Sequence, residues 1–167
     1  MAAESERLWD FALRLYSTAG IGEACLTLQD ECGVDVPILL FAAWLSKHSV
    51  ALTETELVRI DGVVADWRDE VVRPLRNVRR RLKSGPQPAP SQETEALRNS
   101  LKGVELGSEK IELAVLEAEG EALIASGAIH ADATANLALV LRHSHAEAPS
   151  PKAEEALGAI QKTLEAF

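Results

Sequence analysis

The spacing of apolar and polar residues is helical along almost the whole chain, and no segment shows the two-residue alternation of a half-buried strand. In the first half, apolar residues recur every three or four positions. They predict helices at about 5–17, between Gly22 and Gly33, from Asp35 to Leu45, and from Thr53 to Leu82. The second half predicts helices at about 92–103, 109–126, 132–144 and 151–166. We therefore expect an all-α fold.

One of these helices, VPILLFAAWL at 36–45, is apolar on every side. A helix without a polar face has no side to present to water, so it should lie at the centre of an N-terminal helical bundle. Asp35, just before it, is a typical N-cap residue, and Pro37 is tolerated in the first turn. Every aromatic residue except Phe167 precedes residue 68, which also places the large core side chains in the N-terminal half.

The helix from Thr53 to Leu82 opens with the capping-box sequence Thr-Glu-Thr-Glu at 53–56. One continuous apolar stripe follows, formed by Leu57, Ile60, Val64, Trp67, Val71, Leu75, Val78 and Leu82. Pro74 has no backbone N–H to donate, so we expect a kink or a restart of the helix near Arg73.

The segment SGPQPAPS at 84–91 contains three prolines and no large apolar residue, which indicates a semi-stiff linker. Beyond it the chain becomes rich in Ala, Glu and Leu, and residues 93–167 carry thirteen acidic against six basic side chains. This change in composition predicts an N-terminal helical bundle at 1–83, a linker at 84–91 and an acidic, Ala-rich helical region at 92–167.

The net charge of -9 argues against general nucleic-acid binding, because the field of the whole molecule repels phosphates. The longest apolar run, 38–45, is far too short to span a membrane, and the N-terminus does not resemble a signal peptide. Cys25 and Cys32 lie about 10 Å apart along a helix, too far for a disulfide. Two buried free thiols are typical of a cytoplasmic protein.

No catalytic set emerges from the motifs. The chain has no glycine-rich phosphate loop, no nucleophile elbow and no Cys/His cluster at metal-ligand spacing. Asp10 is expected to form a surface ion pair with Arg14, and Asp35 to act as a cap. His143 and His145 point to different sides of a helix, and His130 stands alone in a loop. We therefore expect no cofactor and no metal, and favour a non-catalytic protein.

The segment 67–83, WRDEVVRPLRNVRRRLK, holds seven of the seventeen Lys and Arg residues. On a helical wheel, four cations lie together opposite the apolar stripe: Arg73, Arg76, Arg80 and Lys83. Arg68 and Arg79 flank the buried side. Three interpretations stay open. The cations pair with acidic helices of the same chain or are simply solvated; they bind an acidic protein; or they bind a phosphate-bearing ligand or RNA.

Two functions follow from this pattern. The leading hypothesis is a non-catalytic interaction or regulatory module that docks an acidic partner, or a second copy of itself, through the four outer cations. The alternative is an enzyme or binder of a small anionic, partly apolar ligand held between helices of the N-terminal bundle. Its pocket would use Trp9, Tyr16 and Trp44 as walls and Arg68 or Arg79 as the anion clamp.

The N-terminal half resembles a family of conserved, mainly proteobacterial proteins of unknown function. The segments that carry the resemblance are LWDFALRLY at 8–16, GIGEACLTLQDECGVDVPILLFAAWL at 20–45 and WRDEVVRPLRNVRRRLK at 67–83. The resemblance implies a bacterial, cytoplasmic, all-helical protein and implies no activity. It does not extend beyond residue 92.

Overall fold

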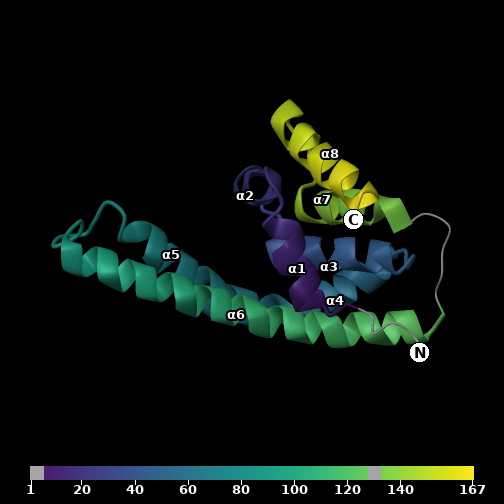
Figure 1. The fold of residues 1–167 in the computed structure, drawn as a ribbon, viewed down its shortest axis with the longest axis horizontal. Helices are drawn as coiled ribbons and strands as arrows, with labels where there is room; N and C mark the ends of the chain where they lie inside the picture. The colour runs from purple at the N-terminus through teal and green to yellow at the C-terminus, as the bar shows by residue number, and fades with distance from the viewer. Residues whose placement is uncertain (1–5, 128–132) are drawn as a thin grey trace. The chain divides into compact units, whose positions relative to one another are not determined.

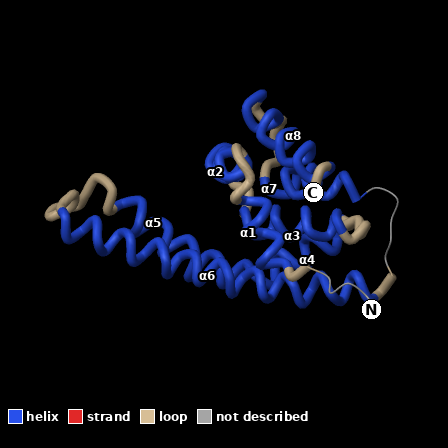
Figure 2. Tube along the Cα trace, viewed as in Figure 1, coloured by secondary structure: helices blue, strands red, loops and turns tan. Residues whose placement is uncertain are grey.

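The computed structural model describes residues 6–127 and 133–167. They form helices joined by turns and loops (Figures 1 and 2), so the fold is all-α, as predicted. Ser5, His130 and Asp132, which entered the sequence predictions, lie outside the described residues. The elements are α1 (Leu8–Tyr16), α2 (Ile21–Cys32), α3 (Val36–Lys47), α4 (Glu54–Trp67), the π-helix η1 (Arg68–Val72), α5 (Arg73–Arg81), α6 (Gln92–Ala125), the 3-10 helix η2 (Ala133–Ala135), α7 (Asn136–Ser144) and α8 (Pro151–Glu165).

The chain divides into two compact units. Unit 1 comprises Met1–Asp61 and Leu113–Phe167, and unit 2 comprises Gly62–Glu112. The limits of the two units differ from the boundaries at 83/84 and 91/92 that the composition predicts. Those domain boundaries stay a prediction. Unit 1 has seven Lys and Arg against eighteen Asp and Glu, whereas unit 2 has ten against eight. The acidic balance of the chain therefore resides in unit 1.

Helix α3 lies at the centre of unit 1, where every residue from Val36 to Leu45 is buried. Helices α1, α2 and α7 pack against it, and α8 packs against α2. Phe11, Phe41 and Trp44 are almost completely inaccessible. The predicted central helix and its aromatic core are confirmed, and the two C-terminal helices complete the bundle around them.

The helix ends of unit 1 follow the predicted capping chemistry. The Ile38 N–H donates to Asp35 Oδ2 at 3.3 Å, and the Ala153 N–H donates to Ser150 Oγ at 3.1 Å. The capping box is reciprocal: the Thr53 N–H donates to Glu56 Oε2 at 2.8 Å, and the Glu56 N–H donates to Thr53 Oγ1 at 3.2 Å. These bonds satisfy backbone donors that have no partner inside the helix.

A buried amide joins α7 to the end of α3. Asn136 is 1% exposed, and its Nδ2 donates to the carbonyl oxygen of Val50 at 2.8 Å. Its Oδ1 accepts from the Leu52 N–H at 2.8 Å. One side chain thus satisfies buried polar groups of the loop after α3. The sequence pattern did not single out Asn136.

Unit 2 contains the end of α4, then η1 and α5, and the first part of α6, which runs back alongside α5 (Figure 1). The predicted linker 84–91 forms the turn that joins α5 to α6. Helix α6 is continuous, so the expected break between 103 and 109 is wrong. The two glycines in this stretch, Gly103 and Gly107, keep their N–H donors, so they lower helix stability without ending the helix.

The break near Arg73 is confirmed. Residues Arg68–Val72 form one turn of π-helix, and the Arg73 N–H bonds to the Arg68 carbonyl oxygen, five residues back. Helix α5 then starts anew with Pro74 in its first turn. A π-turn inserts one extra residue into the helix, so it rotates every later side chain relative to the earlier stripe.

Candidate interaction surface

In unit 2, the end of α4, η1 and α5 form one arm of a helical hairpin, and the first part of α6 forms the other. The π-turn shifts the inward-facing positions of the first arm by one residue. Up to Val64 the predicted stripe is buried. At the first and last residues of the turn, Arg68 and Val72 are buried, whereas Trp67 and Val71 of the predicted stripe are only partly buried. Farther along, Val78 is 49% exposed. The arginines have therefore turned inward in α5, and the apolar stripe has turned partly outward.

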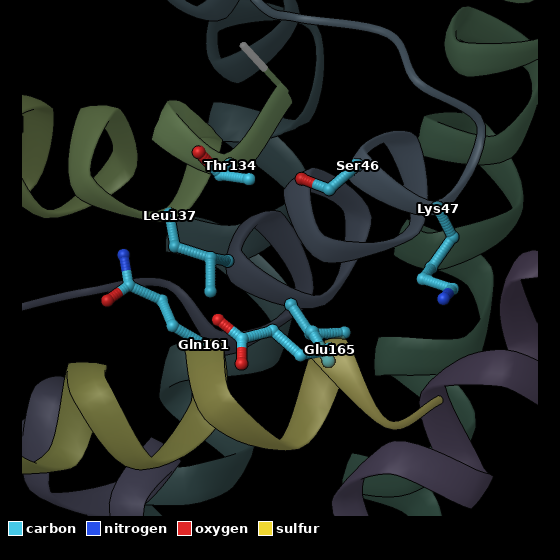
Figure 3. Close-up of a pocket in the computed structure, with 7 residues that line it drawn as sticks. Ser46, Lys47, Thr134, Leu137, Gln161 and Glu165 are labelled. Carbon is cyan, nitrogen blue, oxygen red and sulfur yellow. The ribbon is translucent and has the colours of Figure 1, made fainter.

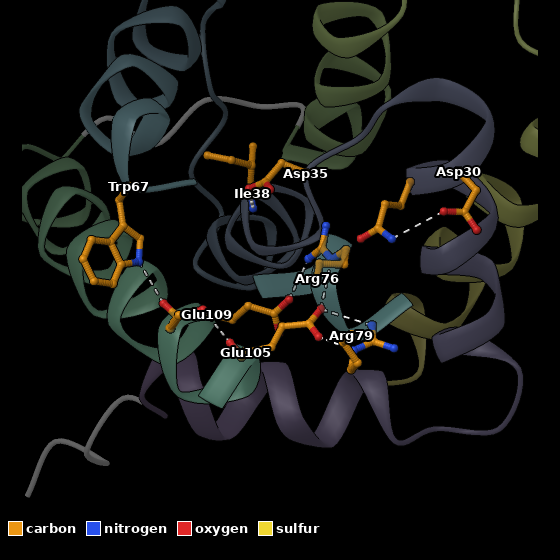
Figure 4. A network of polar contacts seen from close by, with 10 residues as sticks. Asp30, Asp35, Ile38, Trp67, Arg76, Arg79, Glu105 and Glu109 are labelled. Atoms are coloured by element: carbon orange, nitrogen blue, oxygen red, sulfur yellow. Dashed lines mark hydrogen bonds and ion pairs between the residues drawn. The ribbon is translucent and has the colours of Figure 1, made fainter. Parts of the chain in front are cut away.

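Arg76 and Arg79 face two carboxylates of α6 (Figure 4). Arg76 Nε donates to Glu105 Oε1 at 3.0 Å, and Arg76 Nη2 donates to Glu109 Oε1 at 2.7 Å. Arg79 Nε also donates to Glu105, and Arg79 Nη2 donates to Glu105 Oε1 at 3.2 Å. The side chains of Arg76 and Glu105 are only 12% and 8% exposed. This cluster of four residues, here called the ionic core, forms the interior of the hairpin.

The ionic core determines the charge state of its central carboxylate. Burial alone would raise the pKa of Glu105, but hydrogen bonds from Arg79 and Arg76 outweigh it and hold the pKa below the ordinary value. Glu105 is therefore ionised at neutral pH. Its two oxygens accept from both guanidinium groups, which ties α5 to α6 at two successive turns.

Further polar groups continue the same interior. Trp67 Nε1 donates to the Ser108 carbonyl oxygen at 3.0 Å, and the Ser108 hydroxyl donates to the Glu105 carbonyl oxygen at 2.6 Å. Arg68 and Glu112 are 8% and 0% exposed. The interior of unit 2 is thus largely polar, which is uncommon because burial of charge is costly unless the charges are paired.

Three of the four predicted outer cations are exposed: Arg73, Arg80 and Lys83. Arg73 Nη1 pairs with Asp69 Oδ1 at 2.6 Å, four residues earlier on the same outer side. Arg76 lies on the inner face instead, because the helical wheel assumed an uninterrupted α-helix and the π-turn rotates it inward. The interpretation that the cations pair with acidic residues of the same chain therefore describes Arg73, Arg76 and Arg79.

The exposed cations lie in a strongly basic part of the hairpin. Residues 73–104 hold eight Lys and Arg but only two acidic residues, in a chain whose net charge is -9. Lys102 of α6 is also exposed. In an antiparallel hairpin with the ionic core inside, rotation by 100° per residue turns Lys102 to the same side as Arg73 and Arg80. We call Arg73, Arg80, Lys83 and Lys102 the basic surface.

The residues of the alternative ligand pocket are divided between the two units. Trp9, Tyr16 and Trp44 belong to unit 1, whereas Arg68 and Arg79 belong to unit 2. Trp44 is a core residue, 2% exposed, whose Nε1 donates to the Glu6 carbonyl oxygen at 2.9 Å.

Unit 1 has an open cleft of about 440 Å³ between α3, α7 and α8 (Figure 3). Its lining residues are Ser46, Lys47, Thr134, Leu137, Gln161, Leu164 and Glu165. The cleft thus uses none of the residues expected for the ligand pocket. One cation and one carboxylate lie among its lining residues, so a ligand there would meet both signs of charge.

The remaining candidate groups have structural surroundings. Arg14 pairs with Glu6 at 2.6 Å, not with Asp10 as expected, and its guanidinium stacks 3.9 Å from the centre of the Phe167 ring. His143 Nε2 lies 3.0 Å from Asp61 Oδ2. Within the described ranges, no three His, Cys, Asp or Glu side chains gather in a way that could hold a metal ion.

The two cysteines are free and buried, as predicted, and burial raises the pKa of the Cys25 thiol to about 12. At neutral pH this thiol therefore stays protonated and is a poor nucleophile. None of the helices in residues 6–127 and 133–167 has an apolar stretch long enough to cross a bilayer.

The model of a family described as a protein of unknown function (DUF2390) matches residues 7–116. The chain belongs to this family. The match extends beyond the segments that carry the sequence resemblance and includes the part of α6 that supplies Glu105 and Glu109. No curated protein and no solved structure matches the chain.

Proposed function

We propose that this member of the DUF2390 family is a non-catalytic helical interaction module that binds an acidic protein through the basic surface of its hairpin. We also propose that it acts in the cytoplasm of a bacterium. The observation that carries the proposal is the exposure of Arg73, Arg80 and Lys102 on one side of the hairpin and of Lys83 in the turn just after α5, in a chain with a net charge of -9. The ionic core supports it by holding the backbone of α5 in place beneath these cations.

The chemistry of the basic surface favours carboxylates over nucleic acid. Proteins that bind single-stranded nucleic acid stack bases on aromatic side chains placed among the cations. Residues 68–104 contain no Phe, Trp or Tyr. Arginine guanidinium groups bind carboxylates in a two-pronged geometry, and the excess negative charge of the rest of the chain adds long-range repulsion of phosphates.

The alternative, binding of a small anionic ligand in the N-terminal bundle, has less support. Its five residues are divided between two units. The cleft of about 440 Å³ in unit 1 is large enough for a small molecule, but Lys47 and Glu165 place opposite charges among its lining residues. A purely anionic ligand gains little from such a site.

A charge-reversal experiment tests the proposed function. The double variant Arg80→Glu/Lys83→Glu should bind a fluorescently labelled polyglutamate peptide at least about tenfold more weakly than the wild type, because the charges that attract the peptide now repel it. The matched control is Arg142→Glu/Lys162→Glu, which makes the same change in net charge on exposed residues of unit 1. Fluorescence anisotropy at low salt measures all three proteins.

The control should lose much less affinity than the double variant. A labelled polyuridine RNA serves as the second probe, and we expect it to bind the wild type more weakly than polyglutamate does. Equal losses in the two double variants would show that only total charge matters and would remove the basic surface as a site. Tighter binding of RNA than of polyglutamate would replace the acidic protein by a nucleic acid.

A further inference from the structure

The side of the hairpin opposite the basic surface is apolar and exposed. On the arm formed by the end of α4, η1 and α5, Val63 and Val78 are 47% and 49% exposed. On α6, Leu97, Val104 and Ile111 are 53%, 54% and 52% exposed. Rotation of 100° per residue, counted from the ionic core for Val78 and the α6 residues and from buried Val64 for Val63, which precedes the π-turn, turns both sets to the same side of the antiparallel hairpin. We call these five residues the apolar face.

The composition beside the apolar face allows another helix to approach closely. Gly107 and Ser100 flank Val104 on the outer edge of α6. A Cβ added at Gly107 would meet no atom within 4 Å, so the absence of a side chain there serves no contact that the unit makes within itself. Glycine inside a helix costs roughly 1 kcal/mol relative to alanine. Small residues next to an apolar ridge are typical of positions where two helix backbones pack closely.

The charges along the edge of the apolar face are arranged with opposite signs at its two ends. Asp66 and Glu70 lie on the outer edge of the α4–η1 part, and Arg81 lies on the same edge near the end of α5. All three side chains are exposed. If two copies of the hairpin pack with their apolar faces together and their helices antiparallel, the acidic end of each edge meets the basic end of the other.

We propose that the apolar face binds a second copy of this chain, so that two hairpins form an antiparallel four-helix bundle about a two-fold axis near Leu75. The two-fold axis makes the interface self-complementary, because Glu70 of each copy faces Arg81 of the other. Packing buries Val63, Val78, Leu97, Val104 and Ile111 from both copies, which removes a large exposed apolar surface from water. The ionic core stays inside each hairpin and holds its two arms in register.

This inference does not depend on the proposed function, because the basic surface and the apolar face lie on opposite sides of the hairpin. A variant that no longer binds polyglutamate should still dimerise through the apolar face, and a variant that no longer dimerises should still bind polyglutamate through the basic surface. The two proposals therefore fail separately.

Sedimentation velocity of the purified full-length chain tests the proposal. We expect the wild type to be largely dimeric at about 100 µM and Val104→Glu to be monomeric, because a carboxylate at the centre of the apolar face is desolvated on association. The matched control is Leu106→Glu, two residues away on the other side of α6, where the wild-type side chain is 48% exposed. This control should stay dimeric. Circular dichroism should show unchanged helix content in both variants.

A charge swap tests the antiparallel arrangement. Glu70→Arg and Arg81→Glu should each weaken the dimer about threefold, since each puts two like charges opposite each other, and the double variant should restore it because the pair is re-formed with exchanged signs. A wild type that stays monomeric at about 100 µM overturns the proposal, whatever else covers the face. A dimer that survives Val104→Glu places the interface elsewhere, and a swap without rescue overturns the antiparallel pairing.

Discussion

The two units of this chain are built in opposite ways. Unit 1 encloses α3, a helix whose residues from Val36 to Leu45 are all buried. Unit 2 encloses the ionic core of Arg76, Arg79, Glu105 and Glu109. About half of the surface of both Val78 and Val104 is exposed to solvent. The interior of unit 1 is thus mainly apolar, whereas that of unit 2 is largely charged and polar.

The difference shows how much the register of a helix decides. Without the π-turn at Arg68–Val72, the apolar stripe that begins at Leu57 would continue along the inner side of the hairpin. The extra residue places Arg76 inside and Val78 outside. Because burial of apolar groups is reliably favourable whereas buried ion pairs barely offset their desolvation, we expect unit 1 to carry most of the stability of the fold.

The largest expected effect is a truncation in the apolar core. Phe41 is 0% exposed. Phe41→Ala should lower the free energy of unfolding by about 3–5 kcal/mol, because the substitution removes buried apolar area and leaves a cavity. Val104→Ala on the outside of unit 2 should change the unfolding free energy of the dilute protein by less than about 0.5 kcal/mol. Urea denaturation measures both. Similar costs at the two sites would mean that Val104 is buried and would end the contrast between the units.

The next effect is in the ionic core. Glu105→Ala leaves Arg76 and Arg79 without their shared carboxylate, and breaking such a buried pair should destabilise the hairpin by about 3 kcal/mol. Amide hydrogen exchange should rise in α5 and the first part of α6. Glu93→Ala, at an exposed position of the same helix, serves as the control and should leave exchange unchanged. Equal exchange in both variants would show that the ionic core does not hold the hairpin closed.

Alanine substitutions at two glycines of α6 should have smaller effects on stability, and the two effects should have opposite signs. An added Cβ at Gly120 would lie 2.6 Å from Trp44 Cζ3 and 2.8 Å from Phe41 Cε2, so Gly120→Ala should destabilise unit 1 by about 1–3 kcal/mol through overpacking. At Gly107 nothing lies within 4 Å, so Gly107→Ala should stabilise the dilute protein by about 1 kcal/mol through helix propensity. Thermal unfolding at low protein concentration measures both. The same sign at the two positions would contradict the tight interior of unit 1 or the open outer side of unit 2.

The smallest expected effect is the dependence of each unit's stability on acidic pH. Glu105 in unit 2 and Glu117 in unit 1 both have a lowered pKa, Glu117 because Arg7 donates to it. Their contributions to stability are complete above the unfolded pKa of about 4.3 and are lost as the pH falls through the lower folded pKa. Glu105→Gln should flatten this acid dependence in the hairpin alone, and Glu117→Gln in unit 1 alone.

Amide exchange between pH 3 and pH 6 resolves the two units. A hairpin in the Glu105→Gln variant that still loses protection with the wild-type pH dependence would show that the lowered pKa of Glu105 does not stabilise the hairpin.

The sequence predicted the parts of the fold that depend on local chemistry. The apolar helix 36–45, the caps at Asp35 and Thr53, and the restart at Arg73 all follow from residue type and spacing, and all are confirmed. These features need no knowledge of distant segments.

The sequence could not predict what depends on a change of register or on distant partners. Pro74 indicated a break, but not that the break would be a π-turn that rotates Arg76 inward. The continuity of α6 through Gly103 and Gly107 depends on tertiary structure that the helix propensity of its residues does not contain. The role of Asn136 depends on backbone groups of the loop after α3, which are distant in sequence and bond to its side chain only in the folded structure.

Reactivity of single introduced cysteines tests the inverted interior of unit 2 most directly. Val72 is 0% exposed and Val78 is 49% exposed, although the uninterrupted stripe includes Val78 and not Val72. The variants Val72→Cys and Val78→Cys are labelled with a thiol-specific maleimide under native conditions, at a protein concentration too low for self-association. The native cysteines are buried and give a low background. The structure predicts rapid labelling at 78 and protection at 72; rapid labelling at 72 with protection at 78 would contradict it.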